Sequence, residues 1–466
     1  MNMMEKRDVV KTSLSVWVRV GVTAIAVAAG GVQTHRMNAQ AQQPPQVELI
    51  ISSSGGSQTR YAVPDFAAAT PDLAEVGRTL AQVLWNDLEF ERELYMIPRD
   101  TYSSIPRPGA GALPPFPAWR ELGADALVSG SVEKVGDLLR VDFRLYRISD
   151  QQQVLGARYE AEARNPRLLA HRISDEIFAK QRNLKGVART KLAFISDRNR
   201  EPLLGTVEKR EIKELYISDY DGFNEQRITV ARTLTLNPSW SPDAQSIAYA
   251  SVRNSAWDII VSSIYKGTLQ RPAKSIGNNM LPSFSPDGNR VAFTSNRDGN
   301  YEIYVANVDG SGLRRVTTNP ADDVTPTWSP SGDQIAFVSD RTGRPQVYVT
   351  SLDGVGLRLI SQGETHADRP TWSPAPFNEI AFTAQRGSWF DVKVFDFASG
   401  SSRWLTDNRA TGGSNESPAF SPTGRHVAFH STRTRSTQIF VIGRDGNGER
   451  QITRTGNNQT PSWSPN

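Results

Sequence analysis

The sequence predicts a multidomain protein, in which a small N-terminal α/β domain is followed by a six-bladed β-propeller closed by the C-terminal strand. Three observations carry this prediction: a repeat of about 44 residues, a final repeat that stops after its first strand, and a preceding region without the repeat. We place a signal peptide at residues 1–41, the α/β domain at 42–186 and the propeller at 187–466.

The repeat is marked by the motif Pro-x-(Trp/Phe)-Ser-Pro, which occurs six times. Each repeat also carries an apolar-Ala-aromatic triplet, such as Val291-Ala-Phe293, and a third apolar segment, such as Ile303-Tyr-Val305. Four short strands joined by tight turns make one propeller blade, so six copies predict six blades. The motif aromatics are spaced by 44, 44, 44, 48 and 43 residues, at Trp240, Phe284, Trp328, Trp372, Phe420 and Trp463.

The two ends of the repeat region predict how the ring closes. The last repeat stops just after its first strand, at Trp463-Ser-Pro-Asn466, whereas the first repeat begins at Lys191-Leu-Ala-Phe194 and lacks that strand. One strand from the C-terminus therefore completes the first blade. A closed ring leaves no exposed sheet edge.

Residues 42–186 show mixed strand and helix patterns. Val47-Glu-Leu-Ile-Ile51 indicates a strand, and the apolar spacing over residues 73–90 predicts a helix with Asp72 as its N-cap. A short helix is expected near residues 118–122. Three successive strands and a final helix are then expected over residues 126–131, 138–148, 154–162 and 166–181.

The N-terminus has the pattern of a cleaved export signal. A basic start precedes an apolar run over residues 20–29, and Ala39-Gln-Ala41 supplies the small-x-small site of signal peptidase. The run is about half of the roughly 20 residues that a membrane-spanning helix needs, which disfavours the alternative of a short membrane anchor. We expect cleavage after Ala41 and a mature chain without stable membrane insertion.

Charge and composition exclude several classes of function. The formal net charge is +4, but residues 1–41 hold five Lys or Arg and two acidic residues, so the remaining chain is close to neutral. It lacks the excess of basic residues that is typical of proteins that bind nucleic acid. The absence of cysteine excludes disulfides, thiolate metal sites and cysteine nucleophiles.

No catalytic motif is present, and we predict a protein that is not an enzyme and has no catalytic residues, metal or cofactor. The sequence has no Gly-x-Ser-x-Gly, Walker, dinucleotide or His-Glu-x-x-His motif. His426 and His430 share a strand face but lie about 13 Å apart, too far to chelate one ion. Asp-Gly pairs such as Asp309-Gly310 lack the alternating acids of a calcium loop and predict hairpin turns.

An arginine follows the second strand of each repeat. Its six-fold recurrence favours a structural role, tying each blade to a neighbour, over the alternative of ligand binding. The six residues are Arg198, Arg253, Arg297, Arg341, Arg386 and Arg433.

Strand order sorts the loops onto two faces of the propeller. Turns after the first and third strands are tight, whereas connections after the second and fourth strands are longer and irregular. Binding residues usually lie on variable loops over a rigid scaffold, so the segments before each Pro-x-(Trp/Phe) motif are the candidate binding face. The candidates there include Asn278, Asn279, Asp323, His366, Asp368, Asn415, Glu416 and Asn458.

These features together resemble the TolB family, the periplasmic component of the Tol–Pal envelope system of Gram-negative bacteria. The export signal, the small α/β domain and the six repeats carry the resemblance, and Ala62-Val-Pro-Asp-Phe66 is similar to the family's apolar-Pro-Phe segment. The resemblance implies a periplasmic, non-catalytic scaffold that maintains outer-membrane integrity and helps constriction during cell division. It implies a monomer that binds a Pal-like peptidoglycan-associated lipoprotein at the propeller mouth.

The resemblance also implies particular contact residues. The family's Pal-facing positions fall on Asn278, Leu281 and Val324, and the TolA-binding N-terminal segment falls on Gln42-Gln-Pro-Pro-Gln46. In this scheme the N-terminal segment and the mouth communicate, so that one partner changes the affinity for another. Two alternatives stay open: a periplasmic hydrolase acting on sugar or peptide at the channel, and a propeller that binds a small ligand.

Overall fold

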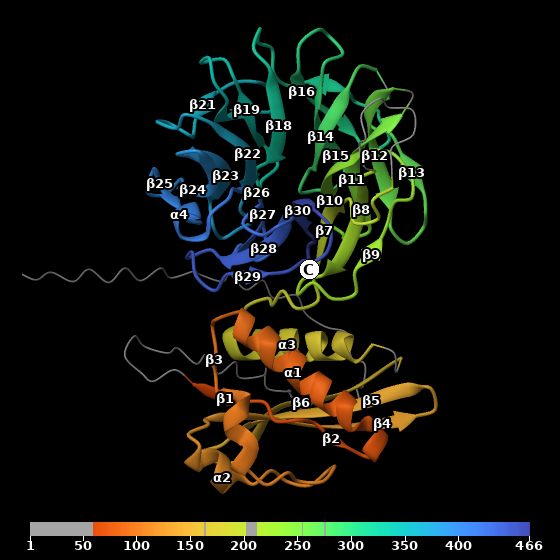
Figure 1. Ribbon diagram of the computed structural model, residues 1–466, viewed down its shortest axis with the longest axis vertical. Coiled ribbons are helices and arrows are strands. Elements are labelled where there is room, and N and C mark those ends of the chain that lie inside the picture. The colour runs from red at the N-terminus through yellow and green to blue at the C-terminus, as the bar shows by residue number, and fades with distance from the viewer. Residues whose placement is uncertain (1–58, 163–164, 202–211, 254, 275) are drawn as a thin grey trace, which may run out of the picture. The chain divides into compact units, whose positions relative to one another are not determined.

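The computed structural model describes residues 59–162, 165–201, 212–253, 255–274 and 276–466 (Figure 1). The expected signal peptide, the strand expected at residues 47–51 and the segment Gln42-Gln-Pro-Pro-Gln46 lie outside the described residues. The described residues belong to one compact unit. No helix among them is long and apolar enough to cross a membrane.

The N-terminal part is built on a mixed sheet with the strand order β3-β1-β4-β5-β6 and β2 beside β4. Three long strands form an antiparallel meander, as the sequence predicts: β4 (Ala126–Val135), β5 (Leu138–Arg147) and β6 (Gln152–Glu162). Three short strands pair in parallel and were not expected, because two or three residues are too few to show a period: β1 (Arg60–Ala62), β2 (Ala67–Ala68) and β3 (Tyr95–Met96).

Two helices cover one face of this sheet (Figure 1), namely α1 (Ala74–Phe90) and α3 (Pro166–Arg182). Their apolar stripes bury Leu84 and Phe178 against alternate residues of the strands, such as Val128. The expected N-cap at Asp72 is wrong, because the chain enters α1 through a 3₁₀ turn, η1 (Pro71–Leu73), and no side chain caps α1. At α3 the Asn165 side chain accepts a hydrogen bond from the Leu168 amide.

The opposite face of the sheet is covered only in part. Leu127, which points away from the Val128 side, packs with Ile105 and Trp119 in a separate cluster. Ile105 directly follows η2 (Arg99–Ser104), and Trp119 belongs to α2 (Phe116–Glu121). The other residues of this face are largely polar, which leaves part of the sheet open.

In the described part of the chain, the remaining strands form six four-stranded antiparallel sheets, which confirms the six-bladed propeller. The boundary between residues 186 and 187 stays a prediction. A one-turn helix, α4 (Asn408–Thr411), lies between the last two sheets. In spatial order the sheets are β30 (Asn458–Trp463), β7 (Lys191–Ser196), β8 (Glu214–Asp219) and β9 (Gln226–Arg227); β10 (Thr235–Trp240), β11 (Ser246–Arg253), β12 (Ala256–Ser263) and β13 (Leu269–Gln270); β14 (Asn279–Phe284), β15 (Arg290–Ser295), β16 (Glu302–Asn307) and β17 (Arg314–Arg315); β18 (Asp323–Trp328), β19 (Gln334–Ser339), β20 (Gln346–Ser351) and β21 (Arg358–Leu359); β22 (Ala367–Trp372), β23 (Glu379–Arg386), β24 (Trp389–Asp396) and β25 (Ser401–Trp404); and β26 (Asn415–Phe420), β27 (His426–Ser431), β28 (Gln438–Gly443) and β29 (Arg450–Gln451).

The motif aromatic packs between neighbouring blades. Trp328 is buried with residues of the preceding blade, and its indole N–H donates to the Ser283 carbonyl of β14 at 3.0 Å. The predicted Asp-Gly hairpins are present as well: Gly310 has a φ of 82°, which glycine adopts without steric cost. Each motif residue therefore has a structural role in building or joining the blades.

The C-terminal strand closes the ring, as the two ends of the repeat region predict. β30 pairs with β7 in the first blade, with Asn458 opposite Ser196 and Trp463 opposite Leu192. The Trp463 indole donates to the Thr190 hydroxyl at 2.8 Å. The chain terminus therefore supplies the innermost strand of the blade that begins the propeller.

The recurring arginines hold strands together within a blade, which corrects the expectation that they tie one blade to the next. Arg341, which follows β19, donates to both oxygens of Asp323 in β18, at 3.0 and 2.9 Å, and to the Ser339 hydroxyl at the end of β19. Arg198, Arg297 and Arg433 make the equivalent bonds, whereas Arg386 bonds Asp391 of its own blade. The structural role itself is confirmed for these five.

Candidate partner-binding site at the propeller channel

The first strands of the six blades line a central channel with repeated x-Pro-x triplets, which surround a cavity of about 160 Å³. The residue before each proline has a left-handed backbone, with φ between 48° and 57°. Each lies where the register of the first strand shifts against the second, as a β-bulge requires. The six residues are Asn237, Leu281, Thr325, Arg369, Ser417 and Thr460.

This backbone is strained for most of the residues that adopt it. A branched or bulky residue such as Thr325 or Leu281 at positive φ is uncommon and costs about 1–3 kcal/mol. The strain recurs in every blade, so the fold maintains it throughout the ring. Strain of this kind often accompanies a surface that must keep one shape for a partner.

The structure places four of the predicted binding residues inside the protein. Asn279, Asp323, Asn415 and Asn458 are each the first residue of a first strand, and none is exposed. Their side-chain oxygens accept the hydrogen bonds of the recurring arginines. Burial raises the pKa of Asp323, while the bond and charge of Arg341 oppose the rise. These four side chains brace the ends of the strands, and we had expected them on the surface.

Of the three positions implied by the family resemblance, one lines the channel. Leu281 is one of the six left-handed residues that line it. Val324 is half-buried and packs against the core between two blades. The Asn278 side chain accepts a hydrogen bond from the Trp257 amide at 3.1 Å, so it also fixes the loop before β14.

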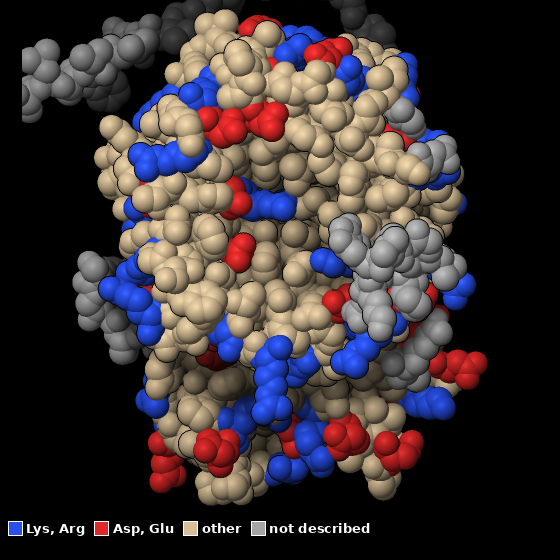
Figure 2. Space-filling model, turned by 45° about the horizontal axis from the view of Figure 1, so that its top comes forward, with Lys and Arg blue, Asp and Glu red and all other residues tan. Residues whose placement is uncertain are grey.

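Charged side chains gather on one side of the channel, around β22 and β26. His366 lies with its Nε2 3.5 Å from the Asp368 carboxylate, and its ring contacts Phe390. Arg369 and Glu416 both interact electrostatically with the Asp368 carboxylate. Figure 2 shows the propeller face toward the viewer as mainly uncharged, with a hollow and a few acidic and basic side chains beside it.

The protonation of this group is shifted by its surroundings. The hydrogen bond that the His366 ring donates to Asp368 raises the pKa of His366, and burial raises the pKa of Glu416 with the Asp368 charge adding to the effect. Burial lowers the pKa of Arg369, against the charges of Asp368 and Glu416. One Asp368 oxygen is buried without a hydrogen bond within the described chain. About a third of the His366 and Asp368 side chains is exposed, so their accessible atoms can contact a partner.

The segments predicted as the binding face end at Leu281, Thr325, Arg369, Ser417 and Thr460, but of these left-handed residues only Leu281 was named as a site residue. Each directly precedes the proline of the repeat motif, so the motif itself marks them. A residue before proline is restricted to extended conformations in an ordinary strand, and nothing in one sequence shows that a bulge reverses this. The sequence signal for these residues is that the position before the proline recurs in every repeat, although the residue there varies, as at Leu281, Thr325 and Arg369.

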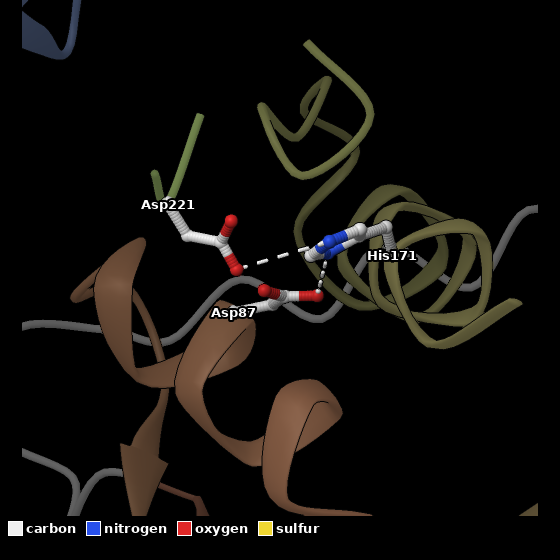
Figure 3. Close-up of side chains that lie close together, drawn as sticks. All are labelled: Asp87, His171 and Asp221. Carbon is white, nitrogen blue, oxygen red and sulfur yellow. Dashed lines mark hydrogen bonds and ion pairs between the residues drawn. The ribbon is translucent and has the colours of Figure 1, made fainter. Parts of the chain in front are cut away.

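A second polar cluster joins α1 and α3 to the turn after β8 (Figure 3). The His171 Nδ1 lies 2.8 Å from Asp87, and its Nε2 points toward Asp221 at 3.8 Å. The Tyr220 hydroxyl donates to the other Asp87 oxygen at 2.7 Å, and Arg167 forms an ion pair with Asp221. Asp87 and His171 are buried. Two carboxylates face one guanidinium here, so a charged His171 makes the cluster electrically neutral.

The surroundings of this cluster raise the pKa of both His171 and Asp87. For His171, burial works against the charged form, but the carboxylates of Asp87 and Asp221 outweigh it and raise its pKa. Burial raises the pKa of Asp87, against the charge and hydrogen bond of His171. The two groups share one hydrogen bond, so they titrate as a pair that holds protons more tightly than the unfolded chain.

Two family models match the chain. The model described as the TolB beta propeller domain matches residues 178–466, and the model described as the TolB amino-terminal domain matches residues 47–154. One model thus matches the propeller and the other matches most of the N-terminal part, up to the start of β6.

Curated relatives and a solved structure agree with these models. Proteins named "Tol-Pal system protein TolB" are 32% identical over 207 residues in Desulfosudis oleivorans, covering 44% of this chain and 45% of that relative, and 32% identical over 240 residues in Alkalilimnicola ehrlichii, covering 52% and 54%. The chain thus spans about half the length of the curated relatives it matches. The crystal structure of TolB from Acinetobacter baumannii has a TM-score of 0.73 at 24% identity, covers 88% of this chain and 98% of its own, and shares the fold.

Proposed function

This chain belongs to the TolB family, and from that premise we propose that it is a periplasmic, non-catalytic scaffold of a Tol–Pal system. In this proposal the propeller mouth, where the segments before the first strands meet, binds a Pal-like peptidoglycan-associated lipoprotein. The mature N-terminal segment is the point of contact for TolA. The complex maintains outer-membrane integrity and assists constriction during division.

The observation that carries the proposal is the ring of left-handed residues at the channel. It gives the mouth a fixed shape, because each residue is held by a bulge, a proline and a pair of hydrogen-bonded strands. A preformed surface binds with less loss of conformational entropy than a flexible one. The charged group around Asp368 and Arg369 adds polar contacts on one side, which suits a protein surface carrying both apolar and charged residues.

The size of the channel favours a protein partner over a small ligand or sugar. Pockets for small molecules are usually about 300–1,000 Å³. The cavity among the six triplets is about 160 Å³, which suits an inserted side chain or loop tip. Glu416 and Asp368 are the carboxylates that a hydrolase at this place would use, and a sugar-sized substrate has little room beside them.

A matched pair of leucine variants tests the proposal. Leu281→Arg puts a cation into the channel lining, and Leu269→Arg puts the same charge on an exposed outer strand. We expect the mature chain and Leu269→Arg to recover a Pal-like lipoprotein from a native envelope extract, and Leu281→Arg to recover about tenfold less or none, the equivalent of at least about 1.4 kcal/mol.

The outcomes distinguish the proposed partner from the proposed place of binding. Equal recovery by all three proteins contradicts binding at the mouth. Recovery by none contradicts the proposed partner and favours the small-ligand alternative. Circular dichroism of each variant shows whether the propeller is folded.

A further inference from the structure

The open face of the N-terminal sheet contains a cavity of about 480 Å³. Its floor is formed by Leu127, Ser129 and Ser131 of β4 and Arg144 of β5, and its walls by residues 64–68 after β1 and by the loop between η2 and α2. The volume falls in the range of small-molecule pockets, about 300–1,000 Å³. Ligands of sheets with parallel strands commonly bind where such strands end, and the chain leaves parallel strand β1 at this wall.

The cavity is built by close packing. A Cβ on Gly130 would lie 2.3 Å from the Phe66 ring, so only glycine lets this ring lie against β4. The Tyr102 hydroxyl donates to the Ile97 carbonyl and accepts from the Val63 amide. These contacts hold the apolar wall and the floor in place before anything binds.

Most charged residues of the cavity are paired, but Arg144 and Asp100 have no ion-pair partner within the described chain. Asp65 pairs with Arg99 and Arg107, and Asp142 pairs with Arg158. Arg144 lies directly opposite Ser129 in the β4–β5 register, so the two side chains are neighbours on the same face. Within the described chain neither Ser129 nor Ser131 has a side-chain hydrogen bond, which leaves a guanidinium beside two hydroxyls.

We propose that this cavity binds a small amphipathic monocarboxylate. Arg144 and the serine hydroxyls receive the carboxylate, since guanidinium–carboxylate bonds are the strong, charge-assisted kind. The apolar body of the ligand packs against Ile105 and Trp119, which cluster with Leu127 on this face of the sheet. A second negative charge is disfavoured, because Asp65 and Asp142 also line the cavity. This site is separate from the propeller mouth and does not depend on the function proposed there.

The test uses 1-anilinonaphthalene-8-sulfonate, an aromatic monoanion whose fluorescence rises in apolar sites, as the probe. We expect the folded protein to bind it, and decanoate but not decanol to displace it. Arg144→Gln is expected to weaken probe binding by about tenfold, because one charge-assisted bond is lost. Arg147→Gln, on the same strand outside the cavity, removes the same charge and is expected to leave binding unchanged.

Three results would overturn the proposal. One is equal probe affinity of the wild type and Arg144→Gln, and another is equal displacement by decanol and decanoate. The third is equal loss of binding in Arg144→Gln and Arg147→Gln. Since Arg144 is exposed and Arg147 is partly exposed, melting curves of the two variants are expected to stay close to that of the wild type, which excludes unfolding as the cause of any loss.

Discussion

Deletion of residues 457–466 is expected to unfold the propeller, because it removes the strand that closes the ring. β30 supplies the innermost strand of the first blade and buries Trp463 against residues on both sides of the closure. Removing a buried tryptophan side chain alone costs about 3–5 kcal/mol. Loss of the whole strand also exposes the edge of β7, in a fold whose net stability is of the order of 5–15 kcal/mol.

The measurement is thermal and denaturant unfolding of the full chain and two shortened forms. The form lacking residues 457–466 is expected to lose its cooperative transition or to aggregate on purification. The control lacks only residues 465–466 and keeps every residue of β30, so its transition is expected to stay close to that of the full chain. A cooperative transition of unchanged midpoint after the longer deletion would show that the ring does not close through this strand.

The second large effect is expected from His171→Leu. The substitution leaves the Asp87 carboxylate buried with Tyr220 as its remaining hydrogen-bond partner. Removal of one member of a buried ion pair costs about 3–5 kcal/mol. Since the pair joins α1 and α3 next to the turn after β8, we expect lower stability and faster amide exchange at Tyr220 and its neighbours.

The same variant is expected to change the pH dependence of stability. The pKa of His171 is raised in the native state, so its contribution is complete below about pH 6.5 and is lost as the pH rises through the native value. The raised pKa of Asp87 has the same sign, because the native state again binds the proton more tightly. The wild type is therefore expected to lose more stability than His171→Leu as the pH rises above about 6.5.

Two other buried histidines change the pH dependence of stability in the opposite direction, and they do so equally in the wild type and the variant. Burial lowers the pKa of both His426 and His430 to about 3, so both destabilise the native state as the pH falls through about 6.5. They are present in both proteins, and the difference between the two stability curves isolates His171. Equal curves would contradict the proposed role of the cluster.

A surface pair is the matched control for this variant. Arg182, the last residue of α3, pairs with Glu93, which lies three residues after the end of α1, and about a third of each side chain is exposed. Arg182→Gln is expected to cost at most about 1 kcal/mol, because water screens such pairs. A loss as small as this in His171→Leu would mean that the buried cluster contributes little to the native state.

The propeller could be predicted from the sequence because its blades repeat. Each copy of the motif places Pro, an aromatic and a tight turn in the same relation, and the unequal ends at Lys191 and Asn466 reveal the closing strand. The long strands and helices of the N-terminal part have clear periods as well. Strands β1, β2 and β3 are too short to show one. β1 and β2 depend on pairing with β4, and β3 depends on pairing with β1.

The candidate site was predicted only in part, because the first strand begins earlier than the motif suggests. Asn279 and Asp323 precede the proline by three residues and looked like loop residues, but they pair with the second strand and are buried. The bulge then turns the residue before proline into the channel lining. The Asp87–His171–Asp221 cluster brings together three distant segments, and no local pattern marks it.

The most direct test of binding at the mouth is photo-crosslinking from inside the channel. A diazirine amino acid of leucine-like size replaces Leu281 in one protein and the exposed Leu269 in the other. Both proteins are irradiated in intact envelopes. Binding at the mouth predicts a covalent adduct with a Pal-like lipoprotein from position 281 and none from position 269. An adduct from position 269 alone, or equal adducts from both positions, would contradict it.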